Sequence, residues 1–291
     1  MKYYDSNDKT FNFIINLILI IIGLTIVLPL LYVLANSLSS IDEVFYGNVW
    51  LIPKSWTLDS YRYILENDNI LIGYRNTILY TIIGTSISLI MTLTSAYALS
   101  RRDLKHRKFI SFFFILTMFI SGGMIPTYLV VDALGMIDTP WGFIIPGSLS
   151  VWNVLVVKTY YETTIPWELQ ESAMIDGCSD FKLFLNIVIP LSAPIIAVMT
   201  LFYAVGYWNS YFNSLIYLND SNLFPLQRVI SDLLVSEDIT GFGSGSYSEQ
   251  GMMLKSLQFT SIIISSLPML LLYPMLQKYF TKGIMMGSLK G

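Results

Sequence analysis

The segment Pro166–Pro194 reads PWELQESAMIDGCSDFKLFLNIVIPLSAP and lies between two strongly apolar stretches of the chain. Its first part, Trp167–Asp176, combines helix formers with acidic groups and follows a proline, which is tolerated at a helix start. Gly177 is then a natural helix stop. A second helical run, Phe181–Ile189, leads directly into apolar sequence. The segment therefore predicts a short amphipathic helix that lies outside the bilayer. Such a helix is suited to a chain whose membrane spans are moved by contacts made outside the bilayer.

The composition is that of a membrane protein. Of the 291 residues, 54% are hydrophobic and only 13% are charged, against about 25% charged in an ordinary soluble domain. Six uncharged runs each exceed the roughly 18 residues that identify a candidate spanning helix. Because backbone polar groups in hydrocarbon must be paired internally, each run is predicted to be helical. The runs are Thr10–Ile41, Asn76–Ser100, Phe109–Val131, Thr139–Val157, Leu183–Asn219 and Ser256–Gln277.

The predicted fold class is an all-α integral membrane protein with six transmembrane helices. A cytoplasmic lead-in covers residues 1–10, the transmembrane domain residues 11–280 and a cytoplasmic tail residues 281–291. A short helix is expected near Leu58–Glu66 in the first outer segment. The loop that contains the acidic helix covers residues 162–186. The spans are expected at about 11–35, 74–99, 109–131, 141–161, 187–207 and 257–280.

Several spans carry residues that predict their local geometry. Gly122, Gly123 and Pro126 predict a kinked or interrupted outer half of the third span. Pro190 and Pro194 are expected to bend the entry to the fifth. The second span is rich in Thr and Ser, which let membrane helices approach closely and bond across the gap. Helix packing is favoured there over a polar pathway.

Basic residues give the orientation. Twelve of the 17 Lys and Arg residues fall in the segments that are inside if the amino terminus is inside, and five fall outside. The run RRDLKHRK, residues 101–108, is the densest cluster and follows the second span. The positive-inside rule therefore predicts cytoplasmic amino and carboxyl termini. The net charge of −3 is modest, and nothing in the sequence suggests binding to nucleic acid.

The sequence contains no constellation for catalysis or nucleotide binding. A phosphate-binding loop ends in Gly-Lys-Ser/Thr, and no Gly-Lys pair occurs. One histidine, His106, and one cysteine, Cys178, exclude the usual zinc sites. No ionisable residue lies at the centre of a predicted span, which argues against an ion-coupled secondary transporter or channel. We expect a non-enzymatic chain that binds no metal or cofactor and is driven by a separate motor.

The acidic loop resembles the signature of ABC importer permeases, written E-A-A, three residues, Gly, nine residues, I-x-L-P. Here Glu171, Ser172 and Ala173 are followed by Gly177 and then by Ile187–Pro190, IVIP, with the nine-residue gap intact. Serine replaces the second alanine and isoleucine the leucine of the pattern. Both replacements are small or isosteric.

Three further motifs resemble sugar-importing permeases of the maltose type, in a branch that handles oligosaccharides. They are SAYALSR at Ser95–Arg101, the pair Trp208–Asn209, and the ending YPMLQKYFTKGIMMGSLKG. The resemblance implies a type I ABC importer permease fold in the bacterial cell membrane. It also implies a second homologous permease, two cytoplasmic ABC ATPase subunits that bind ATP and Mg, and an extracellular or periplasmic solute-binding protein. A permease for a peptide or phosphate is the alternative.

The resemblance implies that the acidic helix couples to the ATPase. Its acidic residues would present charge to a groove on the ATPase, while Ala173, Met174 and Phe181 would dock apolar surface there. The expected coupling residues are Glu168, Glu171, Ser172, Ala173, Asp176 and Gly177.

Aromatic and amide residues near the outer half of the spans are the expected sugar contacts, because sugars stack on aromatic rings and hydrogen-bond to amides. An interfacial aromatic belt is an equal alternative. The glycine-rich segment Thr240–Gly251 is either a linker or a loop that reaches the binding protein, and the carboxyl-terminal tail is either a frayed end or an ATPase contact. The expected substrate-path residues are Trp152, Asn153, Tyr203, Tyr207, Trp208, Asn209 and Asn213.

Overall fold

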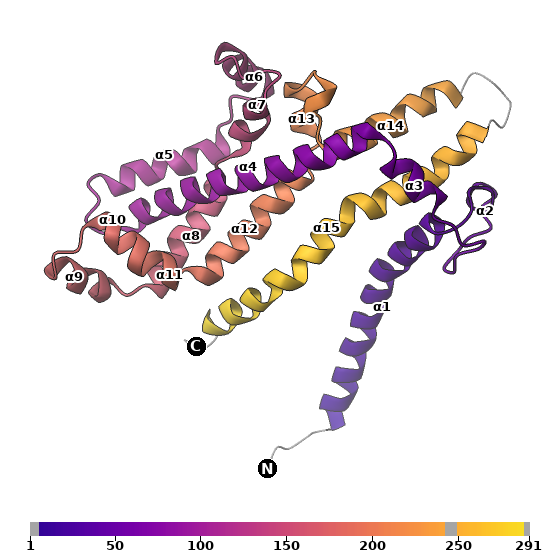
Figure 1. Ribbon diagram of the computed structural model, residues 1–291. Helices are drawn as coiled ribbons and strands as arrows, with labels where there is room; N and C mark the ends of the chain where they lie inside the picture. The colour runs from indigo at the N-terminus through magenta and orange to yellow at the C-terminus, as the bar shows by residue number, and fades with distance from the viewer. Residues whose placement is uncertain (1–5, 242–248, 288–291) are drawn as a thin grey trace. The chain divides into compact units, whose positions relative to one another are not determined.

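The computed structural model describes residues 6–241 and 249–287, and all regular structure in these two ranges is helical (Figure 1). The prediction of an all-α chain is therefore confirmed for this part. The elements, in chain order, are α1 (Ser6–Ser37), α2 (Ile41–Phe45), α3 (Asp59–Leu65), α4 (Asp68–Ser100), α5 (Arg107–Phe119), α6 (Met124–Ala133), α7 (Pro140–Ile144), η1 (Ile145–Gly147), α8 (Val151–Thr164), α9 (Trp167–Ile175), α10 (Asp180–Leu183), η2 (Phe184–Val188), α11 (Ile189–Leu191), α12 (Ala193–Trp208), α13 (Phe212–Tyr217), η3 (Ser221–Leu223), α14 (Leu226–Gly241) and α15 (Glu249–Gly287).

The helices form two compact units. The chain up to Asp68 and the segment Ile230–Leu267 make the first unit, and Asn69–Val229 with the chain from Pro268 onward makes the second. The first unit therefore combines the beginning of the chain with a segment that follows more than 150 residues later. All the residues predicted to couple to an ATPase or to contact substrate belong to the second unit.

In the first unit, the end of α1 is held by contacts with α3, α15 and the turn around α2. Ala35 and Val44 are buried together, and Phe259 packs against their cluster. Ser60 and Ser256 share a hydrogen bond of 2.7 Å in the interior. The predicted short helix near Leu58–Glu66 is confirmed as α3.

Among the described residues, most of α1 packs against no other part of the chain. Its stretch Phe11–Ser37 is long and apolar enough to cross a membrane, with a mean hydropathy of 3.0, and the most apolar window of this stretch is 0% buried. Exposed apolar surface of this extent is unfavourable in water but costs nothing in hydrocarbon. Lipid or another membrane helix must therefore cover α1.

In the second unit, α4 and α12 pack closely through hydroxyl groups. Thr92 Oγ1 and Tyr203 Oη share a hydrogen bond of 2.6 Å, and Ser88 Oγ lies 3.2 Å from Tyr207 Oη. Tyr207 also donates to the carbonyl oxygen of Ile144, at 3.0 Å. The prediction that the hydroxylated residues of the second span pair helices is confirmed for Ser88 and Thr92, whereas Ser86 and Thr94 bond within their own helix. Further along the core, α8 packs against α5 and α12 (Figure 1).

Three of the predicted spans are broken. The helices α5 and α6 meet at 113°, and Gly123 between them adopts φ +87°, which confirms the interruption predicted from the glycine pair. The segment leading into α12 bends by 82° at residue 192, between Pro190 and Pro194 as predicted. A 50° bend, which was not predicted from the sequence, separates α7 and η1 from α8.

The number of spans is confirmed only in part. Among the described residues, α1 and α4 are the two continuous helices that satisfy the length and hydropathy of a span, and there are up to five spans if each bent pair crosses once. The apolar part of α15, Lys255–Leu271, is shorter. Six spans therefore remain a prediction, and only the breaks in the third and fifth of them were expected from the sequence.

Segments outside the predicted spans contain more helix than expected. The amino-terminal lead-in already belongs to α1 from Ser6, and α15 continues past residue 280 to Gly287. The outer segment after residue 208 forms α13, η3 and α14. The glycine-rich loop prediction falls mainly on residues 242–248, which lie outside the described residues.

We expect Gly84→Ala to destabilise the packing of α4 on α12. A Cβ atom at this position would lie 2.6 Å from the Tyr207 ring, so the ring must move and its hydrogen bonds must lengthen. The cost of such overpacking is about 1–3 kcal/mol, measured as a lower thermal midpoint of the purified protein.

Gly206→Ala is the matched control because it changes a neighbouring helical glycine on α12 with no chain atom within 4 Å of the added Cβ. It should leave the midpoint unchanged or raise it slightly, since alanine is favoured over glycine in a helix by about 1 kcal/mol. Equal midpoints for the two variants would contradict the close contact.

Candidate functional site

The acidic helix predicted from the sequence is α9, Trp167–Ile175, and it ends as expected. Gly177 has φ +77°, a conformation that side chains disfavour. Its N–H donates to the carbonyl of Met174 at 3.0 Å, and the N–H of Cys178 donates to that of Ala173 at 2.9 Å. These paired bonds are the Schellman motif, in which a left-handed glycine ends the helix. This motif is the geometric reason for the helix stop that was predicted at Gly177.

The two faces of α9 differ in what they contact. Gln170 and Ala173 are buried, at 7% and 9% exposure. Glu168, Glu171 and Ser172 lie on the exposed face, as does Asp176 at its end. The helix therefore presents a carboxylate-rich face outward and anchors its other face on the chain.

The prediction that Ala173 and Met174 dock apolar surface on another protein stays a prediction. Met174 is half-buried and packs against the core of the second unit, to which Ala173 belongs, and in this structure Ala173 does not offer a free apolar surface. Phe181 does, at 71% exposure, and Ile175 is 85% exposed. Sequence reasoning missed Ile175, although an isoleucine in a charged loop outside the spans was the available signal.

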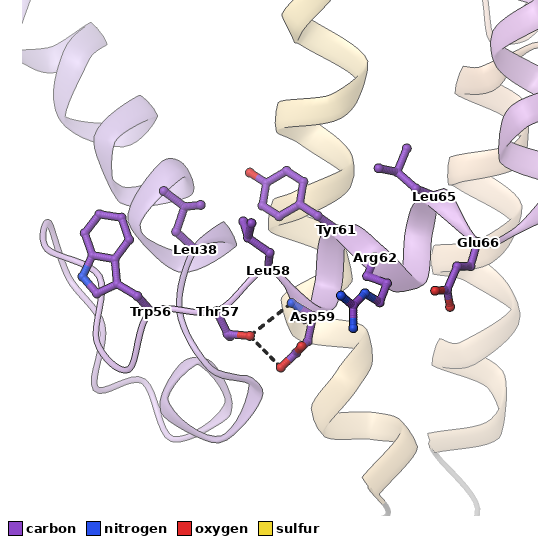
Figure 2. Close-up of a pocket in the computed structure, with 9 residues that line it drawn as sticks. All are labelled: Leu38, Trp56, Thr57, Leu58, Asp59, Tyr61, Arg62, Leu65 and Glu66. Carbon is purple, nitrogen blue, oxygen red and sulfur yellow. Dashed lines mark hydrogen bonds between the residues drawn. The ribbon is translucent and has the colours of Figure 1, made fainter.

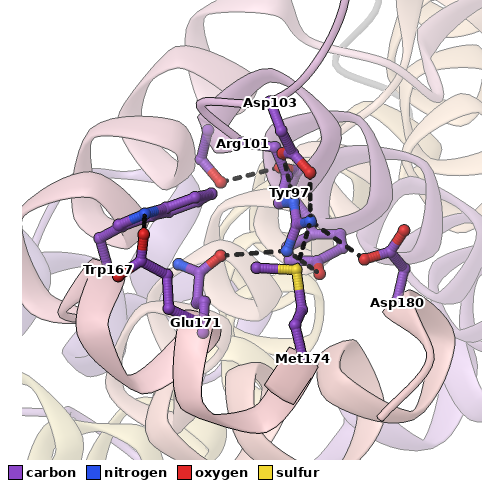
Figure 3. Close-up of polar contacts among 9 residues, drawn as sticks. Tyr97, Arg101, Asp103, Trp167, Glu171, Met174 and Asp180 are labelled. Carbon is purple, nitrogen blue, oxygen red and sulfur yellow. Dashed lines mark hydrogen bonds and ion pairs between the residues drawn. The ribbon is translucent and has the colours of Figure 1, made fainter. Parts of the chain in front are cut away.

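The inner face of α9 is fastened by Arg101, the residue after α4 (Figure 3). Arg101 is 6% exposed. Its Nε and Nη2 donate to the two carboxylate oxygens of Asp103 at 2.8 and 2.6 Å. Its Nη1 lies 3.4 Å from Gln170 Oε1, and its Nη2 lies 3.5 Å from Met174 Sδ. The guanidinium thus joins the end of α4 to two side chains of α9.

The same guanidinium reaches α10 and the start of α9. Arg101 Nη2 lies 3.1 Å from Asp180 Oδ1, and the guanidinium carbon lies 5.5 Å from the centre of the Trp167 ring. The Trp167 indole donates to Glu171 Oε1 at 2.7 Å. The hydrogen bond from Arg101 lowers the pKa of the Asp103 carboxyl, so this partner stays ionised at neutral pH.

Arg101 was not selected as a site residue from the sequence, although it closes the SAYALSR run. It was counted there only as part of the basic cluster that sets orientation. Its burial could not be inferred, because an arginine in a basic loop is ordinarily solvated. The position of Arg101 at the end of the SAYALSR motif was the signal that could have marked it as a site residue.

The residues predicted to contact substrate are largely inside the helix packing. Tyr203, Tyr207 and Trp208 are 6%, 6% and 4% exposed, and both tyrosine hydroxyls bond to neighbouring elements. The prediction of these three as sugar contacts stays a prediction: in this structure they pack helices together. An interfacial aromatic belt does not describe them either, because a belt residue meets the lipid surface.

The remaining four residues are dispersed. Trp152 is 63% exposed, whereas Asn153 is buried at 8%. Asn209 follows α12 and its Nδ2 donates to the Val205 carbonyl at 3.0 Å, while Asn213 on α13 is half-buried. The structure therefore does not bring the seven residues together in one cavity.

Grooves lie elsewhere, one in the first unit and one beside α9 among them. In the first unit, a groove of about 910 Å³ is lined by apolar, aromatic and charged side chains, among them Trp56, Tyr61 and Arg62 (Figure 2). In the second unit, a smaller groove of about 230 Å³ lies beside the anchored face of α9 and includes Trp167 and Gln170. Neither contains a residue predicted for the substrate path.

Comparison with known proteins reveals relatives along almost the whole chain. No family model matches the sequence. The polygalacturonan/rhamnogalacturonan transport system permease protein YtcP of Bacillus subtilis is 39% identical over 289 residues, covering 98% of this chain and 99% of the relative. LplC of B. subtilis is 40% identical over 270 residues, with 93% and 91% covered. The melibiose/raffinose/stachyose import permease MelC of B. subtilis is 29% identical over 282 residues, with 96% of each chain covered.

A solved structure agrees with these relatives. A chain in the crystal structure of a bacterial ABC transporter involved in the import of the acidic polysaccharide alginate superposes with a TM-score of 0.85. The match has 30% sequence identity and covers 96% of this chain and all of that one. Sequence and fold thus agree over the same length, and the signature loop lies on α9 as the resemblance implied. The chain belongs to the family of permease proteins of carbohydrate ABC transporters.

Proposed function

We propose that this chain is the membrane-spanning permease subunit of an ATP-driven, binding-protein-dependent importer of a carbohydrate, of the oligosaccharide class. The observation that carries the proposal is the 39% identity to a carbohydrate transport permease over nearly the full length of both chains. Its partners are a second homologous permease, two cytoplasmic ABC ATPase subunits and an extracellular or periplasmic solute-binding protein. ATP and Mg bind to the ATPase subunits.

The proposed topology has six spans in the bacterial cell membrane, with both termini cytoplasmic. The spans are α1, α4, the three bent helix pairs and the apolar part of α15. The bent pairs support this count because broken helices at membrane depth are tolerated where protein or a water-filled cavity covers the backbone. The excess of Lys and Arg in the inner segments supports the orientation.

The proposed coupling element is α9, seated in a groove of the ATPase. Its exposed carboxylates, Glu168, Glu171 and Asp176, meet that groove together with the apolar side chains of Ile175 and Phe181. Ser172 lies on the same face, and Gly177 lets the chain turn without a side chain in the contact. Ala173 contributes from the other face, because its small side chain lets α9 lie close to the core.

Movement of α9 reaches the spans through Arg101. The guanidinium holds α9 and α10 to the end of α4, and α4 is in turn bonded to α12 through Thr92 and Ser88. ATP binding closes the ATPase subunits, α9 follows, and α4 moves with it toward an outward-open state. Hydrolysis resets the inward-facing state, which is alternating access.

Recognition of the carbohydrate is assigned to the binding protein and to the permease pair together. The relatives named above include permease proteins for polygalacturonan/rhamnogalacturonan and for melibiose/raffinose/stachyose, so the substrate class common to them is a carbohydrate of more than one sugar. Because Tyr203, Tyr207 and Trp208 are occupied in helix packing, this conformation supports few sugar contacts from α12.

We expect uptake only from the complete assembly. The purified permease pair, reconstituted in liposomes with its ATPase and loaded binding protein, should accumulate labelled oligosaccharide when ATP is present. Replacing ATP by a non-hydrolysable analogue should abolish accumulation. Uptake without an ATPase would contradict the proposal and favour a secondary transporter, and uptake of peptide or phosphate alone would contradict the substrate class.

We expect Arg101→Lys to uncouple ATP hydrolysis from transport. Lysine keeps the charge but loses the planar fork that reaches Asp103, Gln170 and Asp180 together. Loss of one charged hydrogen bond costs about 1.5–3 kcal/mol, so the thermal midpoint should fall and stimulation of the ATPase by loaded binding protein should be lost. Arg102→Lys is the matched control, since Arg102 is exposed and its guanidinium meets α9 at the Trp167 ring. Normal coupling in Arg101→Lys would refute the relay.

We expect substitutions of Gly177 to separate backbone strain from docking. Asparagine tolerates the left-handed conformation, and no chain atom lies within 4 Å of an added Cβ. Gly177→Asn should therefore fold and assemble normally, whereas Gly177→Phe should insert in the membrane but lose ATPase binding and transport, because its ring projects into the proposed contact. Copurification of the ATPase measures this, and wild-type uptake by Gly177→Phe would count against docking at the turn.

A further inference from the structure

A basic groove of about 790 Å³ lies beside the start of α5 in the second unit. Four of its nine lining residues carry a permanent positive charge, namely Arg102, Arg107, Lys108 and Lys158. The lining contains no acidic residue. The groove is separate from the exposed face of α9 and has no part in the coupling proposed above.

One carboxylate, that of Glu162, holds two of these cations in place. Glu162 pairs with Arg107 through Oε1 and with Lys158 through Oε2, the latter at 3.2 Å. One negative charge thus holds two positive ones, and the groove keeps a net positive charge after this pairing. Such an arrangement favours an anionic ligand.

The other wall of the groove is apolar and continues along α5. Phe112 and Ile115 line it and are 57% and 39% exposed. Phe109 and Phe113, on the same helix, are 63% and 49% exposed. This helix begins the predicted third span, so its exposed aromatic surface lies where the bilayer interior begins. A ligand that fits must carry an anionic head and an apolar body side by side.

We infer that this groove binds an anionic phospholipid of the inner leaflet, with its phosphate among the cations and its acyl chains along Phe112 and Ile115. Basic pockets between transmembrane helices on the cytoplasmic side hold such head groups. A soluble ATPase could cover the cations but could not follow α5 into hydrocarbon. The inference rests on the proposed membrane permease and its orientation, and it concerns binding rather than transport.

Native mass spectrometry of the complete transporter tests this inference. The complex is titrated with phosphatidylglycerol and, separately, with phosphatidylcholine of the same acyl chains, and the retained lipid is counted. Phosphatidylglycerol should be retained preferentially. A juxtamembrane cation contributes about 1 kcal/mol to anionic lipid binding, so Lys108→Gln should weaken phosphatidylglycerol retention about fivefold.

Lys105→Gln is the matched control, because it removes the same charge from the same loop but lies outside the lining. It should change retention by less than about twofold, as expected for a screened surface charge. Phe112→Ala should weaken retention of long-chain phosphatidylglycerol but not of a short-chain form, which supports an acyl-chain contact.

Three outcomes would overturn the inference. Equal weakening by Lys105→Gln and Lys108→Gln would show a general surface effect. Displacement of the lipid by inorganic phosphate at millimolar concentration would show a free anion site. Retention unaffected by every groove substitution would show that the second permease covers this surface. Uptake assays on the same preparations report separately on the proposed function, so its failure is distinguishable from failure of the lipid site.

Discussion

The guanidinium of Arg101 imposes the main constraint on the packing of α9 and α10. A charge that is 93% removed from solvent must be paired and hydrogen-bonded, because an uncompensated buried charge costs several kcal/mol. The fork satisfies this requirement with Asp103 on its own loop, with Gln170 on α9 and with Asp180 on α10. Separating α9 or α10 from α4 breaks the contacts with Gln170 or Asp180, while the bidentate pair with Asp103 remains. The guanidinium therefore ties the signature helix and the end of α4 into one packed body.

That body extends outward along α4. Gly84 lets the Tyr207 ring lie directly on the α4 backbone, and Thr92 binds the Tyr203 hydroxyl a little more than two turns further along. Tyrosine suits this role because it fills a large volume while its hydroxyl satisfies a polar partner on the adjacent helix. The same contacts that make α12 follow α4 remove these aromatic side chains from any path through the bilayer. In this conformation, the tyrosines that were predicted to contact a ligand are thus the ones that join α12 to α4.

The features that were predicted correctly from the sequence are the ends, breaks and bends of helices. The extent of α9, its end at Gly177, the break at Gly123 and the bend between Pro190 and Pro194 all follow from backbone preferences of single residues. The roles of Arg101, Ala173 and Tyr203 did not follow, because they depend on which side of a helix meets another helix. In a membrane chain, hydropathy does not distinguish these sides, since lipid and protein interior are equally apolar. The bend between η1 and α8 was not predicted for a related reason: hydropathy measures length in hydrocarbon, not straightness.

The absence of ionisable groups from the centres of the predicted spans has a mechanical consequence. Such a span gains no energy from moving in a membrane potential or from exchanging a proton, because both require a charge within the bilayer. In the proposed mechanism, the energy for a conformational change enters at a surface outside the membrane and arrives as displacement of packed helices. Hydrogen-bonded contacts that could transmit such a displacement run in the second unit from α9 through Arg101 to α4 and α12. The buried polar contacts along this route thus lie where the proposed mechanism requires rigidity.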